Sequence, residues 1–250
     1  MRISWRSRAA LAVCGVLGGA VCAPAVAAAA AAPGSVSFAG APRIGALFSG
    51  EPQPRHHFCT ASVVDSPRRD LIVTAAHCLG GRAGSNPGAV FVPGYRDGRA
   101  PYGRWRIAQI FVDPHWSRSH DPDYDVAFAT TAGSLPVEDA VGSEAIRFRP
   151  RAGGSAVAVG YPDRSERPVY CAARLSVFRA QRQLRFVCPG LPDGTSGGPL
   201  LARGAGGANG RETVLAVIGG YQQGGTTAGV SYASYLGSGI AALYRRAAAG

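Results

Sequence analysis

Three short sequence patterns contain residue types that together can transfer an acyl group. Residues 74–78 (TAAHC) place a histidine and a cysteine at the end of an apolar run. Residues 125–128 (DVAF) place an aspartate at the start of another apolar run, after a polar loop. Residues 194–199 (GTSGGP) hold a serine among glycines, before two leucines. The order along the chain is therefore histidine, aspartate, serine.

Acyl transfer by a serine requires one of each of these groups. A serine hydroxyl is a poor nucleophile at neutral pH, so His77 would act as the base that removes the proton of Ser196. A buried carboxylate, that of Asp125, would hold the imidazole in one tautomer and stabilise its cation. The backbone N–H groups of Gly194 and Ser196 would donate hydrogen bonds to the oxyanion. The alternative interpretation of Ser196 is a structural serine in a turn.

The other histidines lack this context. Neither an apolar run with an adjacent cysteine nor a matching order of motifs accompanies them, so we interpret them as surface or loop residues. They are His56, His57, His115 and His120.

The rest of the sequence predicts many short strands separated by turns. Glycine accounts for 35 of the 250 residues and proline for 18, which disfavours a mostly helical chain. Short strands at regular spacing predict an all-β sandwich or barrel. The expected strands are His57–Val64, Leu71–Ala75, Ala89–Val92, Trp105–Val112, Asp125–Thr130, Ser155–Val159, Val169–Phe178, Gln183–Val187, Pro199–Leu201, Thr213–Gly219 and Gly229–Ala233.

These strands form two sets of about five or six, divided near residues 133–143, which favours two small β-barrels. One helix is expected at the end of the chain, over Ser238–Ala249. The apolar residues on one face of this helix are Ile240, Leu243, Tyr244 and Ala247.

The composition bounds the class of protein. Hydrophobic residues make up 46% of the chain, which is enough for a sizeable core. The formal net charge is +11, but the basic residues, all arginine, are scattered along the sequence without interleaved aromatic residues. Because binding to nucleic acid needs a contiguous basic patch, we expect no nucleic-acid partner.

The N-terminus predicts a signal peptide over residues 1–27. Three arginines precede an apolar run, and residues 25–27 (AVA) supply the small-x-small pattern of a cleavage site. We expect cleavage after Ala27, with cleavage after Ala25 as the competing possibility. An uncleaved anchor is the alternative, although Pro24 interrupts the apolar stretch. We interpret residues 28–43 as a leader or short pro-segment, and expect a secreted protein without stable membrane association after signal removal.

Removal of the signal would leave Cys59, Cys78, Cys171 and Cys188. Four cysteines allow three connectivities, and two disulfides are the default in an oxidising compartment. Pairing Cys59 with Cys78 and Cys171 with Cys188 would close loops of about twenty residues, each worth about 3 kcal/mol in the chain-entropy model. A zinc site is the alternative, but the chain has no C-x-x-C pair, so no metal is expected.

These features resemble those of trypsin-like (chymotrypsin-fold) serine proteases. The motifs TAAHC, DVAF and GTSGGP carry the resemblance, and their order is that of chymotrypsin. Cys59 and Cys78 match the disulfide of the family's histidine loop. Asp121 and Asp123 are rivals to Asp125, but the family's aspartate directly precedes a small apolar strand. Three further segments resemble secreted bacterial members, and they are Gly160–Pro162, Cys188–Gly190 and Ile218–Tyr221.

The resemblance implies two six-stranded antiparallel β-barrels, over residues 44–143 and 144–250, with a C-terminal helix and an active site between them. It implies a serine endopeptidase that hydrolyses protein or peptide substrates through a Ser-His-Asp triad and an acyl-enzyme, without a cofactor. We expect the protein to be a monomer. The alternatives are a protease-like binding protein without useful turnover and a secreted esterase that uses the same triad.

Two positions depart from the best-known members of this family. Thr195 stands where they carry the aspartate that captures a newly cut N-terminus, so activation through a buried terminal ammonium is not expected. Gly190 lies six residues before Ser196, where the trypsin branch has an acid, so trypsin specificity is disfavoured. Glutamate specificity is not indicated either. The preferred side chain is left unassigned, in a pocket expected to include Gly190, Gly219, Gly220 and Gly229.

Overall fold

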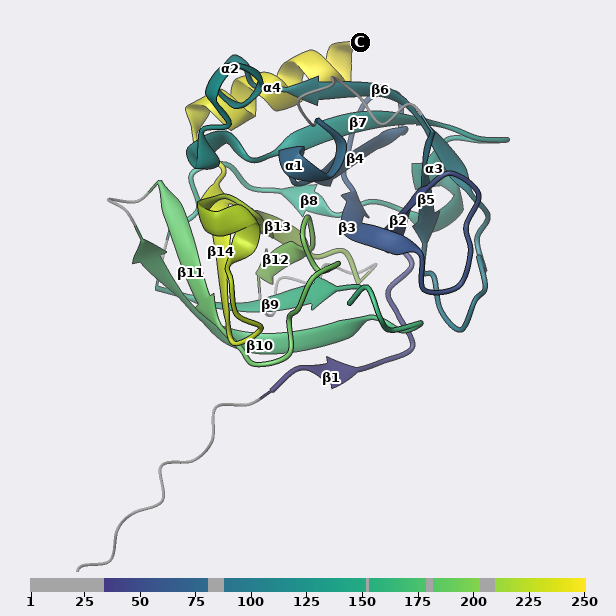
Figure 1. The fold of residues 1–250 in the computed structure, drawn as a ribbon. Coiled ribbons are helices and arrows are strands. Elements are labelled where there is room, and N and C mark those ends of the chain that lie inside the picture. Colours follow the sequence, from purple (N-terminus) through teal and green to yellow (C-terminus); the bar gives the residue numbers. More distant parts are fainter. Residues whose placement is uncertain (1–33, 81–87, 152, 179–181, 203–209) are drawn as a thin grey trace, which may run out of the picture. The chain divides into compact units, whose positions relative to one another are not determined.

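The computed structural model describes residues 34–80, 88–151, 153–178, 182–202 and 210–250. The predicted signal peptide, residues 1–27, lies outside these ranges, as do residues 28–33 of the predicted leader. Within the described ranges, the chain forms two β-barrels, one after the other, and ends in a helix (Figure 1). The predicted architecture of two six-stranded antiparallel barrels with a C-terminal helix is confirmed.

Six antiparallel strands close the first barrel in the order β2-β3-β4-β7-β6-β5. Their bounds are β2 Ile44–Ser49, β3 His57–Val63, β4 Leu71–Thr74, β5 Ala89–Pro93, β6 Trp105–Val112 and β7 Ala127–Ala132. The strand β2 was not among the expected strands. Its Gly45 weakens the strand signal, yet the structure requires glycine there because a Cβ atom would overlap the carbonyl of Val92 in β5.

The second barrel is built from six strands that also pair antiparallel. Their bounds are β9 Ser155–Gly160, β10 Val169–Phe178, β11 Gln183–Val187, β12 Pro199–Ala202, β13 Thr213–Ile218 and β14 Val230–Tyr235. The long strand β10 pairs with β9 along its first half and with β11 along its second, and this closes the ring. Two short strands are added to this sheet, namely β1 (Val36–Ser37) beside β10 and β8 (Ala145–Ile146) parallel to β13.

The apolar residues alternate between the interior of each barrel and the contact between the barrels. In β4, Ile72 belongs to the interior of the first barrel, whereas Leu71 and Val73 belong to a cluster that also includes Val159 and Leu201 of the second. Successive residues of a strand point to opposite faces, so β4 is buried on both sides. The side chains that pack between the barrels are therefore different from those that fill the interior of each barrel.

The C-terminal helix α4 spans Ser238–Ala249, as expected. Its Ile240, Leu243 and Ala247 are buried against the cluster shared by the barrels, and the ring of Tyr244 packs at 5.5 Å from that of Phe128 in β7. The helix thus returns from the second barrel to the first (Figure 1). No helix in the described ranges is long and apolar enough to cross a membrane.

In the part of the chain that the structure describes, three short α-helices and two 3-10 turns lie between the strands and were not predicted. They are α1 (Ala76–Leu79), α2 (Pro114–Ser119), α3 (Val137–Val141), η1 (Pro122–Tyr124) and η2 (Tyr221–Gly224). Each is too short to show a helical period in the sequence.

Both cysteine pairs considered from the sequence form disulfides. Cys59 in β3 is bonded to Cys78 in α1, and Cys171 in β10 is bonded to Cys188, which directly follows β11. The first bond ties α1 to the barrel, and the second ties the loop after β11 to β10.

The described part of the predicted leader is packed onto the second barrel. Ser35 donates from its backbone N to the Pro189 carbonyl and from its hydroxyl to the Gly190 carbonyl, both at 2.7 Å. Phe38 donates to the Pro168 carbonyl, and its ring lies 5.4 Å from that of Tyr170. Residues 34–38 therefore contribute hydrogen bonds and apolar contacts to the folded barrel.

A chain that begins at residue 42 is accordingly expected to be less stable than one that begins at residue 34. It loses the β1 pairing, the hydrogen bonds of Ser35 and the burial of Phe38, together worth about 2–4 kcal/mol. The urea midpoints of the two chains measure the difference. Equal midpoints would show that this segment contributes nothing to stability.

His57 is the first residue of β3 and is buried, so its interpretation as a surface or loop residue is wrong. Its Nε2 donates to the Pro162 carbonyl at 2.7 Å, and its ring packs against Phe48, Tyr95 and Tyr161. Burial lowers the pKa of His57, and this outweighs the opposing effects of the Pro162 hydrogen bond and of Glu166. The imidazole is thus held neutral in the fold.

This burial predicts acid sensitivity. Below the unfolded-state pKa of about 6.5, unfolded chains bind a proton at His57 that folded chains do not. Stability should therefore fall with decreasing pH below that value, by up to about 1.4 kcal/mol per pH unit from this residue. Urea denaturation between pH 7.5 and 5 measures the slope. A His57→Gln variant should show a shallower slope, and an unchanged slope would contradict the assignment.

Candidate active site

His77 is placed by a one-turn helix that begins directly after β4. The disulfide of Cys78 fixes this helix to β3. The backbone at His77 is therefore held by β4, which precedes it in the chain, and by β3 through the disulfide. The backbone N of His77 donates to Oδ1 of Asp125 at 2.9 Å, and its Nδ1 donates to Oδ2 at 2.7 Å. With its proton on Nδ1, the ring leaves Nε2 as the basic nitrogen.

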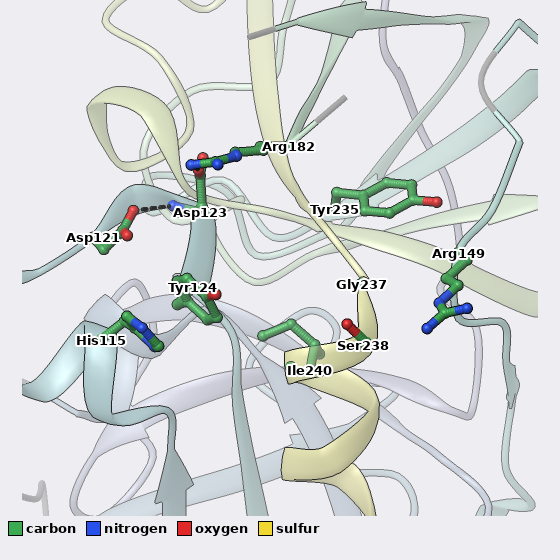
Figure 2. A pocket seen from close by; sticks show the side chains of 11 residues that line it. His115, Asp121, Asp123, Tyr124, Arg149, Arg182, Tyr235, Gly237, Ser238 and Ile240 are labelled. Carbon is green, nitrogen blue, oxygen red and sulfur yellow. Dashed lines mark hydrogen bonds and ion pairs between the residues drawn. The ribbon is translucent and has the colours of Figure 1, made fainter. Parts of the chain in front are cut away.

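Asp125 lies between the turn η1 and strand β7, and it is fully buried. The turn before it is stabilised by the Asp121 carboxylate, which accepts from the backbone N of Asp123 at 3.0 Å (Figure 2). Besides the two bonds from His77, Oδ2 of Asp125 accepts from the backbone N of Gly220 at 2.7 Å. A buried carboxylate is costly unless hydrogen bonds satisfy it, and these three do so.

Ser196 lies in the loop that joins β11 to β12 in the second barrel. Thr60 in β3 donates from its backbone N to the Ser196 carbonyl at 2.8 Å, so the loop is bonded to the first barrel. Gly197 has φ +78°, and a Cβ atom there would overlap Thr74 Oγ1 and lie 3.0 Å from the backbone N of Ala75. Glycine is required at this point because the serine loop reaches the backbone two residues before His77.

The serine hydroxyl is directed to a backbone carbonyl. Ser196 Oγ lies 3.4 Å from the Gln223 carbonyl oxygen, and no hydrogen bond in the described part of the chain joins it to His77. Two cavities lie near these groups, one beside Ser196 and one beside His77. Gln223 lines both of them. The turn η2, which contains Gln223, therefore borders both cavities and contacts Ser196 directly.

The backbone of residues 193–196 directs two amides away from the protein's own acceptors. The Asp193 carbonyl accepts from Asp163 N at 2.9 Å, and the Thr195 carbonyl accepts from Gly198 N at 2.9 Å. In a trans peptide the N–H points opposite to the carbonyl, so the N–H groups of Gly194 and Ser196 face the other way. No acceptor among the described residues engages either one. Both are available to an oxyanion.

A cavity of about 200 Å³ adjoins Ser196. Its lining is mostly small and uncharged, with one carboxylate, that of Asp193. The lining residues are Leu191, Pro192, Asp193, Thr195, Ser196, Ile218, Gln223, Gly224, Gly225, Thr226, Thr227 and Ala228.

None of the four glycines expected in the pocket is among the residues that line this cavity. Gly190 and Gly229 adjoin the lining residues Leu191 and Ala228 in the chain. Gly219 packs against Asp125, where a Cβ atom would lie 3.0 Å from Oδ2, and Gly220 lines the cavity beside His77.

The other histidines and carboxylates of the sequence analysis have different environments. His115 bonds to Asp113 at 2.7 Å and stacks on Tyr124, while His120 lines the cavity beside His77. His56 is exposed. Asp123 accepts a hydrogen bond from Gln183.

Cys59, His77 and Cys78 bring their ligand atoms within 4.8 Å of one another, a grouping of the kind that binds metals. Both sulfur atoms are committed to the disulfide, however, so they are not thiolate ligands.

Thr195 is buried, and its hydroxyl donates to the Pro192 carbonyl at 2.6 Å. The residue that stands in place of the family's aspartate therefore has its hydroxyl hydrogen-bonded within its own loop.

Sequence reasoning missed three contributors to this arrangement. Thr60 bonds to the serine loop through its backbone N and also through its hydroxyl, which donates to the Gly194 carbonyl at 3.0 Å. Gly220 supplies a donor to Asp125, and Gln183 holds the turn before it. No sequence motif marks Thr60 or Gln183, and Gly220 was expected only as a pocket residue, because these roles depend on contacts between distant segments.

The sequence also matches a known family. Residues 59–210, which are more than half of the chain, match the trypsin-like peptidase domain. The chain belongs to this family. A comparison with curated protein sequences found no match.

Solved structures of proteases share the fold. The protease Anisep from Arthrobacter nicotinovorans is 26% identical, with a TM-score of 0.73 over 86% of this chain and 99% of that one. The thermostable serine protease AL20 from an extremophilic microorganism is 26% identical, with a TM-score of 0.71 over 84% and 98%. A Glu endopeptidase shares the fold at 17% identity, with a TM-score of 0.70 over 88% and 99%. This trypsin-like peptidase thus resembles these solved proteases over nearly their whole length.

The oxyanion geometry predicts the effect of one substitution. Gly194 has φ +88°, and a Cβ atom there would overlap the backbone N of Asp163. Gly194→Ala should therefore displace the Gly194 amide and lower kcat/KM by about 100-fold or more. Peptide hydrolysis measures the change. Gly154→Ala is the control, because no heavy atom lies within 4 Å of its Cβ position. A Gly194→Ala variant as active as this control would contradict the role of the amide.

Proposed function

We propose that this trypsin-like peptidase is a secreted serine endopeptidase that acts through an acyl-enzyme on Ser196. The observation that carries the proposal is the His77–Asp125 pair, in which the buried carboxylate accepts from both the backbone N and Nδ1 of the histidine. This pairing fixes the tautomer that leaves Nε2 free to accept a proton. The family match supports a peptide bond as the substrate.

In the proposed mechanism, Ser196 Oγ turns from the Gln223 carbonyl toward Nε2 of His77 and attacks the scissile carbonyl carbon. Nε2 takes the hydroxyl proton, and the amides of Gly194 and Ser196 donate to the oxyanion. The C–N bond then breaks as Nε2 gives the proton to the leaving amine. Water repeats the sequence on the ester, which releases the acid product and restores Ser196.

The cavity lining supports a preference for uncharged side chains at the cleavage site. None of its residues in the described ranges is cationic, which disfavours an acidic side chain. Its only carboxylate is that of Asp193, and this residue also lines a separate cavity with His57 and Gly194. Asp193 is exposed, and water weakens its attraction for a basic side chain.

Secretion is proposed from the predicted signal peptide and from the two disulfides, which persist in oxidising compartments. We also propose that the protein acts as a monomer on protein or peptide substrates.

The position of the serine hydroxyl favours a second candidate. Because Ser196 Oγ lies near the Gln223 carbonyl rather than on His77, a protease-like binding protein without useful turnover has one specific observation behind it. No specific observation favours the esterase alternative.

Covalent labelling tests the proposal. A fluorophosphonate should label the purified protein at Ser196, and Ser196→Ala should abolish labelling and lower kcat for peptides by about 10⁴-fold or more. Ser176→Ala, an exposed serine of β10, is the matched control and should behave as wild type. Folded protein that neither labels nor cleaves peptides would favour the binding protein. Labelling with cleavage of esters alone would favour the esterase.

A further inference from the structure

Gln183 is a fully buried amide at the start of β11, outside the groups assigned to the reaction. Its Nε2 donates to the Pro122 carbonyl at 2.7 Å and to Oδ1 of Asp123 at 2.9 Å. Its Oε1 accepts from the backbone N of Tyr221 at 3.2 Å. A buried amide must have such partners, and here the partners come from two segments far apart in the sequence.

Both segments adjoin Asp125. Pro122 and Asp123 form the turn that leads directly into Asp125, and Tyr221 follows Gly220, whose N–H donates to Asp125 Oδ2. Gly220 itself has φ +77°, and a Cβ atom there would overlap Oε1 of Gln183. The side chain of Gln183 therefore packs directly on the peptide that bonds to the buried carboxylate.

We propose that Gln183 is a positioning residue, whose side-chain amide holds the Gly220 N–H on Asp125 and thereby fixes the His77 imidazole. The inference rests on the proposed function of His77 and Asp125. Gln183 joins the first barrel's turn to the second barrel's η2 segment and sets the distance between them. Without this bridge, the donor from Gly220 moves away, and the carboxylate keeps only its bonds to His77.

A matched control lies opposite Gln183 in the sheet. Ser234 in β14 is its cross-strand partner, is equally buried, and donates to the same Pro122 carbonyl at 3.0 Å. No bond of Ser234 reaches the Gly220–Tyr221 segment within the described residues. Ser234→Ala therefore removes a buried hydrogen bond from the same turn without releasing Gly220.

The charged groups near His77 determine the expected pH effect. His77 faces Asp125, and His120 at the end of α2 lines the same cavity. Asp121 and Asp123 lie in the adjoining turn, and Arg182 pairs with Asp123 at 3.5 Å (Figure 2). Loss of the Gly220 donor leaves more of the Asp125 charge to stabilise the imidazolium. The acid limb of kcat/KM, which reports the base in the free enzyme, should then move to higher pH.

The test compares Gln183→Met with Ser234→Ala by steady-state kinetics on a peptide substrate. For Gln183→Met we expect kcat to fall on the order of 10- to 100-fold with KM nearly unchanged. The acid limb should move to higher pH. Ser234→Ala should keep the wild-type kcat and acid limb even where its thermal midpoint falls. Equal kcat and equal acid limbs in the two variants would overturn the proposal.

A second variant and a labelling control keep the outcome decisive. Where Gln183→Met does not fold, Gln183→Asn replaces it, since an amide one methylene shorter cannot reach Pro122 and Tyr221 together. It should show the same changes with smaller size, and wild-type kinetics would overturn the proposal.

Fluorophosphonate labelling distinguishes failure of the proposed function from failure of the positioning role. An unlabelled wild type contradicts the proposed function, whereas a labelled wild type with equally fast labelling of the Gln183 variant contradicts the positioning role alone.

Discussion

The Asp125 carboxylate has no exposure to solvent, and the need to satisfy it organises the site. A buried charge without partners would cost several kcal/mol, so each of its bonds constrains a segment. His77 supplies two donors from the first barrel, and Gly220 supplies one from the second. The group that orients the imidazole is thus also one of the groups that fix the distance between the barrels.

A second constraint is the close approach of the serine loop to the first barrel. At Gly197 the two backbones leave no room for a Cβ atom, and Thr60 bonds to the loop through its backbone N and its hydroxyl. These contacts fix the peptide planes around Ser196, and the planes in turn direct the amides of Gly194 and Ser196. Packing between barrels therefore decides the geometry that would stabilise an oxyanion.

The turn η2 connects these two constraints. It begins beside the Gly220 donor and continues to Gln223, whose carbonyl lies near the Ser196 hydroxyl. Gln222 and Gln223 both adopt left-handed dihedrals, with φ of 53° and 54°. Such conformations cost about 1–3 kcal/mol each in non-glycine residues, so surrounding contacts must hold them. The bond from the Tyr221 amide to Gln183 is one such contact.

The sequence by itself determined the two-barrel class, most of the strands, the terminal helix and the local motifs. Periodicity and turn residues report on neighbours in the chain, which is why α4 was predicted with its observed ends. The sequence analysis missed β2, the short helices, and the roles of Thr60, Gly220 and Gln183. Only the tertiary structure decided that the Ser196 hydroxyl lies near Gln223 and that Gln183 bridges two turns. The Ser196–Gln223 contact joins residues 27 positions apart, and the contacts of Gln183 with Asp123 and Tyr221 span 60 and 38 positions. No local sequence pattern encodes contacts over such separations.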